Sequence, residues 1–382
     1  MRTPKLATRA VTIMAVPLLL AAATGVAPAA SAAAQPAPAG PAASFTINGF
    51  LNGVAAVSAR DAWAVGSTLS GKTLILRWNG KAWKRVPSPS AHGPGADNFL
   101  YGVTATSATN AWAVGFAYVG TTGKTLLLRW NGKTWKRVPS PAPADLSLYA
   151  VAATSARNAW AVGADEHGAL ILHWDGTVWK RVPSPGLKGA FEAVAATSAR
   201  NAWAVGFAGI AGGTGVPSTN RPLIMRWNGV AWKRVPSHLA PGLGNLRGVA
   251  ATSAGNAWAV GCTGCSAEGA GDPLIERWDG TAWKHVPGPS SDDLDGLWGV
   301  AATAPTNAWA VGTPDGGPGH TTGIVRWNGH TWKPVPSPNP GGQEHVYGVA
   351  ATSARNAWAV GQTEATTPFK SVISHWNGIA WN

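Results

Sequence analysis

The sequence has little charge, almost no cysteine and no sign of long helices. Only 12% of its 382 residues are charged, and two are cysteine. Runs of Ala, Glu, Lys and Leu at helical spacing are missing, which excludes a coiled coil or another long-helix protein. Glycine, proline and tryptophan are abundant instead, with 48, 29 and 22 copies. Because 45% of the residues are apolar, the chain can build one large core or several small cores in series.

The motifs of common catalytic and cofactor sites are also missing. No Gly-x-Ser-x-Gly nucleophile elbow occurs. Cys262 and Cys265 have no further ligands at zinc spacing and no strand–helix setting for a redox motif, so we expect a local disulfide between them. The acidic stretch 291–296 lacks the later glutamate of an EF-hand loop. We therefore expect no metal site and no cofactor.

The N-terminal segment predicts export. Arg2, Lys5 and Arg9 precede an apolar stretch over about 10–26, and Ala30 and Ala32 form a small-x-small cleavage site. Residues 1–32 are therefore interpreted as a signal peptide, and 33–43 as a Pro/Ala linker. No second apolar stretch follows, so we expect a secreted protein with no integral membrane span. The formal net charge of +13 includes three cations of the signal segment.

One sequence unit recurs seven times across the rest of the chain. It reads G-V-A-A-T-S-A-R-N-A-W-A-V-G, then a variable stretch, then L-I-L-R-W-N-G-K-T-W-K-R-V-P-S-P. Its first tryptophan stands at Trp63, Trp112, Trp160, Trp203, Trp258, Trp309 and Trp358. Its second stands at Trp78, Trp130, Trp174, Trp227, Trp278, Trp327 and Trp376. Its third stands at Trp83, Trp135, Trp179, Trp232, Trp283, Trp332 and Trp381.

Each copy contains four short β-prone runs, termed A to D. In the first copy these runs cover 54–57, 62–66, 74–78 and 83–87. The Asn-Gly or Asp-Gly between runs C and D predicts a two-residue type I′ hairpin, in which Leu76 pairs with Trp83. Four antiparallel strands at a period of about 45–50 residues are typical of a propeller blade. The sequence therefore predicts an all-β, seven-bladed β-propeller over 44–382, with repeats that start near 51, 101, 149, 192, 247, 298 and 347.

The repeat resembles a known group of propellers. The order G-V-A-A-T, turn, A-W-A-V-G and L-x-x-R-W-N-G-x-x-W is similar to tectonin-type repeats and to Trp-rich repeat propellers of secreted bacterial proteins. The resemblance covers 51–382 and implies the fold, whereas propellers of this kind include lectins, scaffolds and enzymes. The 21 tryptophans of the unit are expected to pack between blades.

The last blade lacks part of its fourth run. The chain stops at Trp381 and Asn382, without the Lys-x-Val-Pro that continues run D elsewhere. Upstream of the first copy, residues 44–47 (Ser-Phe-Thr-Ile) alternate in polarity but belong to no repeat. We expect this N-terminal strand to supply outer-strand pairing to the seventh blade and so to close the ring.

The connections of the unit differ in how much they vary. The distance from the valine of run A to the first tryptophan is nine residues in every copy, whereas the first and second tryptophans lie 14 to 24 residues apart. The third tryptophan and the first tryptophan of the next copy lie 24 to 29 residues apart. The B–C and D–A connections therefore vary, and they share one face of the disc. On that face, the position two before the run-A valine mixes aromatic, acidic and basic residues and is expected at the mouth of the central channel. It is occupied by Asn52, Tyr101, Tyr149, Glu192, Arg247, Trp298 and Tyr347.

Three functions remain open on this basis. Aromatic rings with a few polar groups suit a sugar, so the first is a binding module for a glycan or an anionic cell-envelope polymer. The second is an enzyme that acts on a glycan or a small metabolite through Glu192, Tyr149 and Arg247. The third is a scaffold for a protein partner. Lys and Arg at fixed positions of run D predict a basic outer rim, nucleic acid is not expected as a partner, and the protein is expected to be a monomer.

Overall fold

The protein is described by a computed structural model that covers residues 47–93, 95–120, 122–141, 147–184, 188–209, 220–239, 243–265, 271–289, 294–314, 323–338, 344–363 and 370–382. The predicted signal peptide, the linker and residues 44–46 lie outside these ranges. The described residues form 27 strands and no helix. Within them there is thus no helix of the length and apolar character that crossing a bilayer requires.

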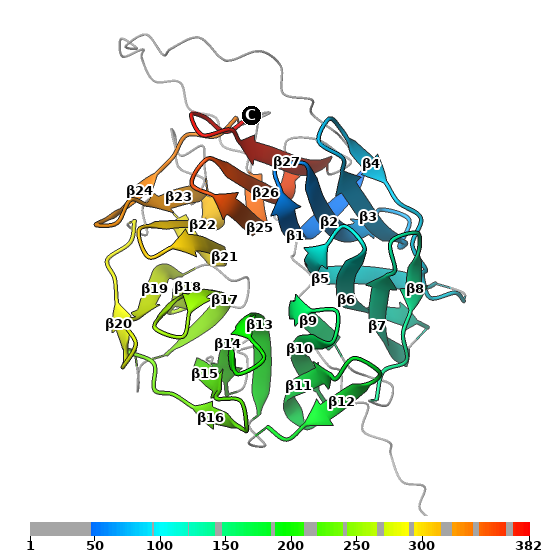
Figure 1. The fold of residues 1–382 in the computed structure, drawn as a ribbon, viewed down its shortest axis with the longest axis horizontal. Helices are drawn as coiled ribbons and strands as arrows, with labels where there is room; N and C mark the ends of the chain where they lie inside the picture. The colour runs from blue at the N-terminus through cyan, green and yellow to red at the C-terminus, as the bar shows by residue number, and fades with distance from the viewer. Residues whose placement is uncertain are drawn as a thin grey trace, which may run out of the picture.

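The strands form seven antiparallel sheets arranged as the blades of a closed ring (Figure 1). Six sheets have four strands, and the seventh has three. The order within each sheet follows the chain, from an inner strand A to an outer strand D. The predicted seven-bladed β-propeller is therefore confirmed.

Strands A and B form the inner half of every blade. Strands A are β1 (Gly49–Ser58), β5 (Asp97–Ser107), β9 (Ser147–Ser155), β13 (Gly189–Ser198), β17 (Gly244–Ser253), β21 (Leu294–Ala304) and β25 (Glu344–Ser353). Strands B are β2 (Asp61–Thr68), β6 (Asn110–Val119), β10 (Asn158–Asp165), β14 (Asn201–Ala208), β18 (Asn256–Thr263), β22 (Asn307–Pro314) and β26 (Asn356–Thr363). The inner strands carry Val-Ala-Ala in six blades and Val-Thr-Ala in the second, and these small side chains suit the crowded axis.

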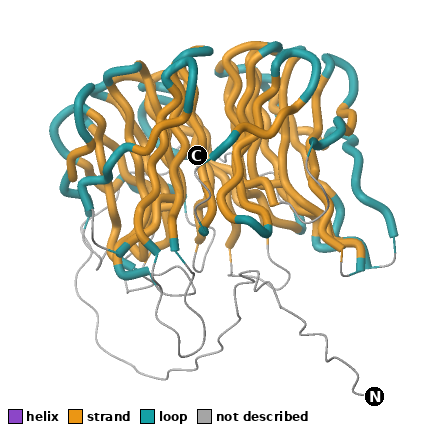
Figure 2. Tube along the Cα trace, turned by 90° about the horizontal axis from the view of Figure 1, so that it is seen from below, coloured by secondary structure: helices purple, strands orange, loops and turns teal. Residues whose placement is uncertain are grey.

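Strands C and D form the outer half. Strands C are β3 (Thr73–Trp78), β7 (Thr122–Trp130), β11 (Gly168–Trp174), β15 (Arg221–Trp227), β19 (Asp272–Trp278), β23 (Ile324–Trp327) and β27 (Lys370–Trp376). Strands D are β4 (Trp83–Arg85), β8 (Trp135–Arg137), β12 (Trp179–Val182), β16 (Trp232–Arg234), β20 (Trp283–His285) and β24 (Trp332–Pro334). Seen edge-on, the strands run between the two faces of the disc, so the B–C and D–A connections share one face (Figure 2).

The tryptophans hold neighbouring blades together. The strand-B tryptophan of each blade packs against the second and third tryptophans of the next blade, with ring centroids 4.9–5.1 Å apart. Trp358 of the seventh blade meets Trp78 and Trp83 of the first in the same way, at 5.0 Å. Seven copies of one three-tryptophan cluster therefore close the ring.

A cation or an imidazole covers each cluster. In five blades a strand-C arginine lies over the strand-B tryptophan, with Cζ 4.8–5.1 Å from the ring centroid, and donates to a carbonyl in the A–B turn of the next blade. In the third and seventh blades, His173 and His375 stack on Trp160 and Trp358 at 4.1 Å instead. These side chains therefore belong to the framework between blades.

The seventh blade uses both ends of the described chain in place of a fourth strand. Asn48 forms a bridge with Lys370, and the amide of Ser371 donates to the carbonyl of Ile47 at 3.0 Å. At the other end of β27, His375 and Asn382 exchange two backbone hydrogen bonds of 2.9 Å. The pairing expected from the N-terminal segment is thus present at Ile47 and Asn48, whereas residues 44–46 lie outside the described part of the chain.

The predicted two-residue hairpin between strands C and D is wrong. Trp78 pairs with Trp83, and Leu76 pairs with Arg85, so four residues form the connection. The Asn79 side chain accepts hydrogen bonds from the amides of Lys81 and Ala82 at 3.0 Å, and Gly80 has a φ of 90°. An asparagine-capped turn therefore replaces the type I′ turn, because the side chain satisfies two loop amides that a tighter turn would not contain.

Candidate functional site

The seven positions predicted to lie at the channel mouth share one backbone feature. Each is the extra residue of a β-bulge in the first half of strand A, where the pairing with strand B skips one residue. These residues are Asn52, Tyr101, Tyr149, Glu192, Arg247, Trp298 and Tyr347, and we call them the ring. A bulge re-aims the extra side chain and ends the strict alternation of faces. The position at which the residue type varies between repeats is thus the position at which strand A is bulged.

A glycine of strand B permits each bulge. In the first blade, a Cβ on Gly66 would lie 1.8 Å from the carbonyl oxygen of Phe50. In the fourth blade, a Cβ on Gly206 would lie 2.0 Å from the carbonyl oxygen of Ala190. No side chain fits at these distances, so the glycine of the A-W-A-V-G motif is required by the neighbouring bulged strand.

A second set of glycines lets the inner strands touch. A Cβ on Gly53 would lie 2.4 Å from the carbonyl oxygen of Tyr101, and one on Gly299 would lie 2.8 Å from that of Tyr347. Gly348 faces Asn52 across the junction of the last and first blades in the same manner, at 3.0 Å. Neighbouring backbones therefore approach closely beside the ring, which brings the ring side chains of adjacent blades into contact.

The ring contains two groups of aromatic side chains. Tyr101 and Tyr149 meet edge-to-face at 5.8 Å, on the second and third blades. Trp298 and Tyr347 meet edge-to-face at 5.7 Å, on the sixth and seventh blades. Arg247 of the fifth blade lies over Trp298, with Cζ 4.0 Å from the ring centroid. Stacking on Trp298 therefore extends the second aromatic group with a cation.

Glu192 and Arg247 form the charged part of the ring. Burial raises the pKa of Glu192, and the positive charge of Arg247 opposes that shift. Burial lowers the pKa of Arg247, and Glu192 opposes it in turn. The two groups thus stabilise each other's charge on neighbouring blades. Asn52, on the first blade, instead donates from Nδ2 to the carbonyl of Leu100 at 2.9 Å.

Further polar side chains lie behind Trp298 and Tyr347. The indole of Trp298 donates to Thr313 Oγ1 at 3.0 Å, and that hydroxyl lies 3.3 Å from His345 Nδ1. Glu344, the residue before His345 in β25, is buried, and burial raises its pKa to about 7. The sequence did not single out these residues, because only the position two before the run-A valine was compared between the repeats. The signal was present two and three residues before Tyr347, where the repeat also varies.

The two cysteines form the expected disulfide, between Cys262 at the end of β18 and Cys265. Among the described residues, no group of three or more His, Cys, Asp or Glu is placed to hold a metal ion.

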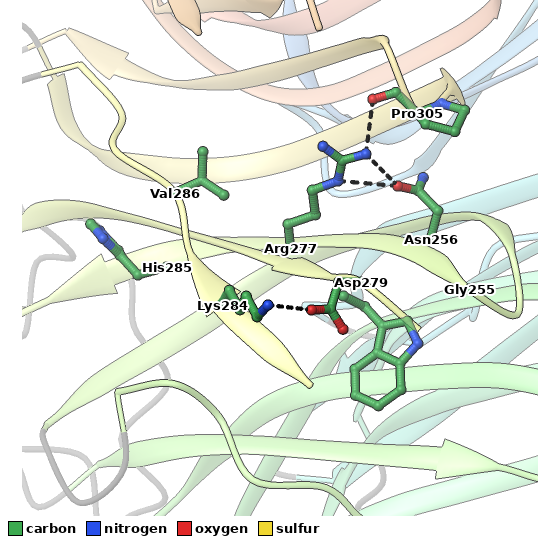
Figure 3. A pocket seen from close by; sticks show the side chains of 9 residues that line it. Gly255, Asn256, Arg277, Asp279, Lys284, His285, Val286 and Pro305 are labelled. Atoms are coloured by element: carbon green, nitrogen blue, oxygen red, sulfur yellow. Dashed lines mark hydrogen bonds and ion pairs between the residues drawn. The ribbon is translucent and has the colours of Figure 1, made fainter. Parts of the chain in front are cut away.

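A pocket of about 490 Å³ lies between the outer parts of the fifth and sixth blades (Figure 3). Its polar groups engage one another, since Arg277 donates to Asn256 and to the carbonyl of Pro305, while Lys284 pairs with Asp279. This pocket is therefore part of the framework.

No protein-family model matches the chain, and no curated protein matches it significantly. Solved structures share its fold. YCF48 bound to a D1 peptide is 14% identical with a TM-score of 0.53, over 86% of this chain and 94% of that one. YCF48 from Cyanidioschyzon merolae is 15% identical with a TM-score of 0.52, over 87% and 97%. A polysaccharide lyase, the PL25 ulvan lyase bound to -[GlcA(1-4)Rha3S]-, is 10% identical with a TM-score of 0.56, over 89% and 96%. At these identities the likeness shows the propeller fold alone.

Proposed function

We propose that the protein is a binding module that holds a carbohydrate at the mouth of its channel, against the ring. One observation carries this proposal, namely the arrangement of two aromatic groups around a polar axis. The second and third blades, which carry the pair Tyr101 and Tyr149, face the sixth and seventh across the channel (Figure 1), and those carry the pair Trp298 and Tyr347.

The polar ends of the ring complete the arrangement. Asn52 stands on the first blade, and Glu192 and Arg247 stand opposite it on the fourth and fifth. Apolar walls with a few polar groups between them match a sugar, which has flat C–H faces and hydroxyls at its edges. The lyase of the same fold is bound to an acidic glycan, which supports this ligand class.

An enzyme that uses Tyr149, Glu192 and Arg247 is less well supported. Burial, followed by the charge of Glu192, raises the pKa of Tyr149 to about 12, which disfavours the phenolate that a nucleophile or base requires. Most glycosidases also use two carboxyl groups, whereas the ring has one. The electrostatics of the ring therefore favour binding over turnover.

A protein partner is the second candidate. Tyr, Trp and Arg are the residues that dominate binding energy in protein interfaces. YCF48, which has the same fold, is bound to a peptide. An extended peptide segment across the ring would use the same aromatic side chains, so the two candidates must be separated by the ligand offered.

A glycan array tests the proposal, with wild type and a Trp298→Ala/Tyr347→Ala variant. We expect a glycan signal that the variant lowers by about tenfold or more, since each aromatic contact contributes about 1 kcal/mol. Val230→Ala/Ile379→Ala is the matched control, because both side chains are exposed on outer turns, at 84% and 87%. Absence of any glycan signal, or a signal that both variants leave unchanged, contradicts the proposal. Hydrolysis or elimination products that Glu192→Gln abolishes would favour the enzyme.

We propose, in addition, that the protein acts outside the cell after removal of residues 1–32. The disulfide between Cys262 and Cys265 supports this, because such bonds persist in oxidising compartments. N-terminal sequencing of protein recovered from the medium should give Ala33 as the first residue. Retention of the full chain inside the cell would contradict export.

A further inference from the structure

The positive charge of the protein is concentrated in two neighbouring blades. Residues 47–141, which form the first and second blades, contain eleven Lys or Arg and two Asp. Residues 142–382 contain sixteen Lys or Arg and fifteen Asp or Glu. The excess of positive charge is therefore confined to one sector of the propeller.

Eight of these cations occupy four equivalent positions in the two blades. They lie at the start of strand C, in the C–D turn and on strand D, and all are exposed. We call them the basic sector, which comprises Lys72, Lys81, Lys84, Arg85, Lys124, Lys133, Lys136 and Arg137. Strands β4 and β8, which carry four of them, are the outer strands of two adjacent blades on the outer wall (Figure 1). The sector thus spans two adjacent outer edges.

The other blades differ at the turn. The position of Lys81 and Lys133 is occupied elsewhere by Thr177, Val230, Thr281, His330 and Ile379. In the third and fifth blades the turn begins with Asp175 or Asp279, which pair with the strand-D lysines Lys180 and Lys284 at 2.8 and 2.6 Å. The turns of the basic sector begin with Asn79 and Asn131, whose side chains cap the same loop amides without a charge. Among the described residues, no ion pair neutralises a cation of the sector.

We propose that the basic sector binds an anionic polysaccharide, one that carries sulfate or carboxylate groups along the chain. Unpaired cations repeated on adjacent blades fit charges that repeat along a flexible polymer, and six of the eight are lysines, which act as point charges without fork geometry. This surface is distinct from the ring, because it lies on the outer wall rather than at the channel. The inference therefore does not depend on the function proposed for the ring.

The side chains around the sector disfavour other polyanions. Single-stranded nucleic acids stack their bases on exposed aromatic rings, yet Trp83 and Trp135 beside these cations are buried. Binding to an anionic membrane is strengthened by exposed apolar side chains, and among the described residues of these two blades Leu69 is the one large apolar side chain that is exposed. A hydrated polysaccharide needs neither feature, so it is the partner that the surface fits.

The positive charge of the basic sector can be lowered by replacing its two C–D turns with a C–D turn from another blade. The variant Asn79→Asp/Lys81→Thr/Asn131→Asp/Lys133→Thr copies the Asp-Gly-Thr turn of the third blade into the first and second blades. It removes two lysines and adds two aspartates, which lowers the net charge by four, and the new aspartates are placed to pair with Lys84 and Lys136 as Asp175 pairs with Lys180. Because Asp175 caps its turn as Asn79 does, the variant should fold as the wild type does.

A matched second variant restores the net charge elsewhere. It adds Asp279→Asn, Thr281→Lys, Val230→Lys and Ile379→Lys to the first variant, all in exposed turns of other blades. Affinity for dextran sulfate, with neutral dextran as the reference, is then measured for the three proteins at low and at moderate salt. Near-ultraviolet circular dichroism checks that each variant is folded.

We expect dextran sulfate to bind the wild type, with an affinity that falls as salt rises, and to bind the first variant about tenfold more weakly. The second variant should remain as weak as the first, because its charges lie on other blades. Recovery of wild-type affinity in the second variant would overturn the proposal, since net charge alone would then suffice. Equal binding by all three proteins would overturn it too, as would tighter binding to a single-stranded oligonucleotide or to anionic vesicles than to dextran sulfate.

Discussion

Two histidines in the framework make a sharp test of how the blades are held together. His173 and His375 occupy the position that arginine has in five blades, and each stacks on the strand-B tryptophan and contacts an asparagine Oδ1 at 2.8 Å. The arginines also donate to the next blade, at 2.9–3.3 Å. In the third blade the carbonyl that such an arginine would reach is that of Ala199, which already accepts a hydrogen bond from Trp227.

The variant His173→Arg should therefore gain a charge-assisted hydrogen bond to the fourth blade. Such a bond contributes about 1.5–3 kcal/mol, and holding the longer side chain in one rotamer costs about 1 kcal/mol. We expect the free energy of unfolding to rise by about 1 kcal/mol at pH 7.5. The same substitution at His375 should act at the junction of the last and first blades.

The pH dependence gives the more specific signature. Burial lowers the pKa of both histidines below the ordinary value of 6.5, so below that pH the unfolded chain binds protons that the folded chain excludes. The stability contributed by the neutral stack is complete above about pH 6.5 and is lost as the pH falls. Since both rings are only partly buried, we expect a loss of at most about 1 kcal/mol per histidine at pH 5.

Urea denaturation at pH 5 and pH 7.5 measures both effects. In the double variant His173→Arg/His375→Arg, the difference in stability between the two pH values should shrink relative to wild type. The raised carboxyl pKa values elsewhere affect both proteins equally and cancel in this comparison. Arg226→His is the reciprocal control, which should lower stability and add acid sensitivity. If the double variant keeps the wild-type pH dependence, the histidines do not act as described.

Two further predictions concern the bulges and the closure of the ring. Gly206→Ala would place a Cβ 2.0 Å from the carbonyl oxygen of Ala190, so the bulge at Glu192 would have to move. We expect the free energy of unfolding, measured by urea denaturation, to fall by about 2–4 kcal/mol. The control Gly255→Ala, whose Cβ would lie 3.9 Å from its nearest neighbour, should change stability little. Deletion of 33–48 removes the pairing of Ile47 and Asn48 with β27 and should lower the melting temperature. An unchanged melting temperature would show that the seventh blade closes without the N-terminal segment.

The fold was predictable because the same four-strand pattern occurs seven times in the sequence. The spacing from the run-A valine to the first tryptophan, and that from the second tryptophan to the third, is the same in all seven copies, and these spacings identify the blades before any contact is known. The prediction that the 21 tryptophans pack between blades is confirmed by the clusters, each of which joins two repeats. Which tryptophan meets which could not be predicted, because a contact between blades leaves no trace in the spacing within one unit.

The C–D turn shows where a local pattern misleads. Asn-Gly between two β-prone runs is the usual signal of a type I′ hairpin, yet here it begins a four-residue turn. The pairing of Trp78 with Trp83 decides the register, because both rings must pack against Trp358 of the preceding blade. A tertiary contact thus overrides the preference of the dipeptide.

The charged residues of strand D show that local sequence is also a limited guide to function. Along the sequence, the lysines of strand D look equivalent, because six of the seven repeats have one directly after the third tryptophan. In the structure, Lys180 and Lys284 are neutralised by the aspartates of their own turns, whereas Lys84 and Lys136 face turns that begin with asparagine. A single Asn-to-Asp exchange within the repeat therefore separates a framework ion pair from a cation that is available to a partner. The irregular positions of this protein, at the turns and at the bulges of the ring, are the ones to which function can be assigned, because the regular positions are already used by the fold.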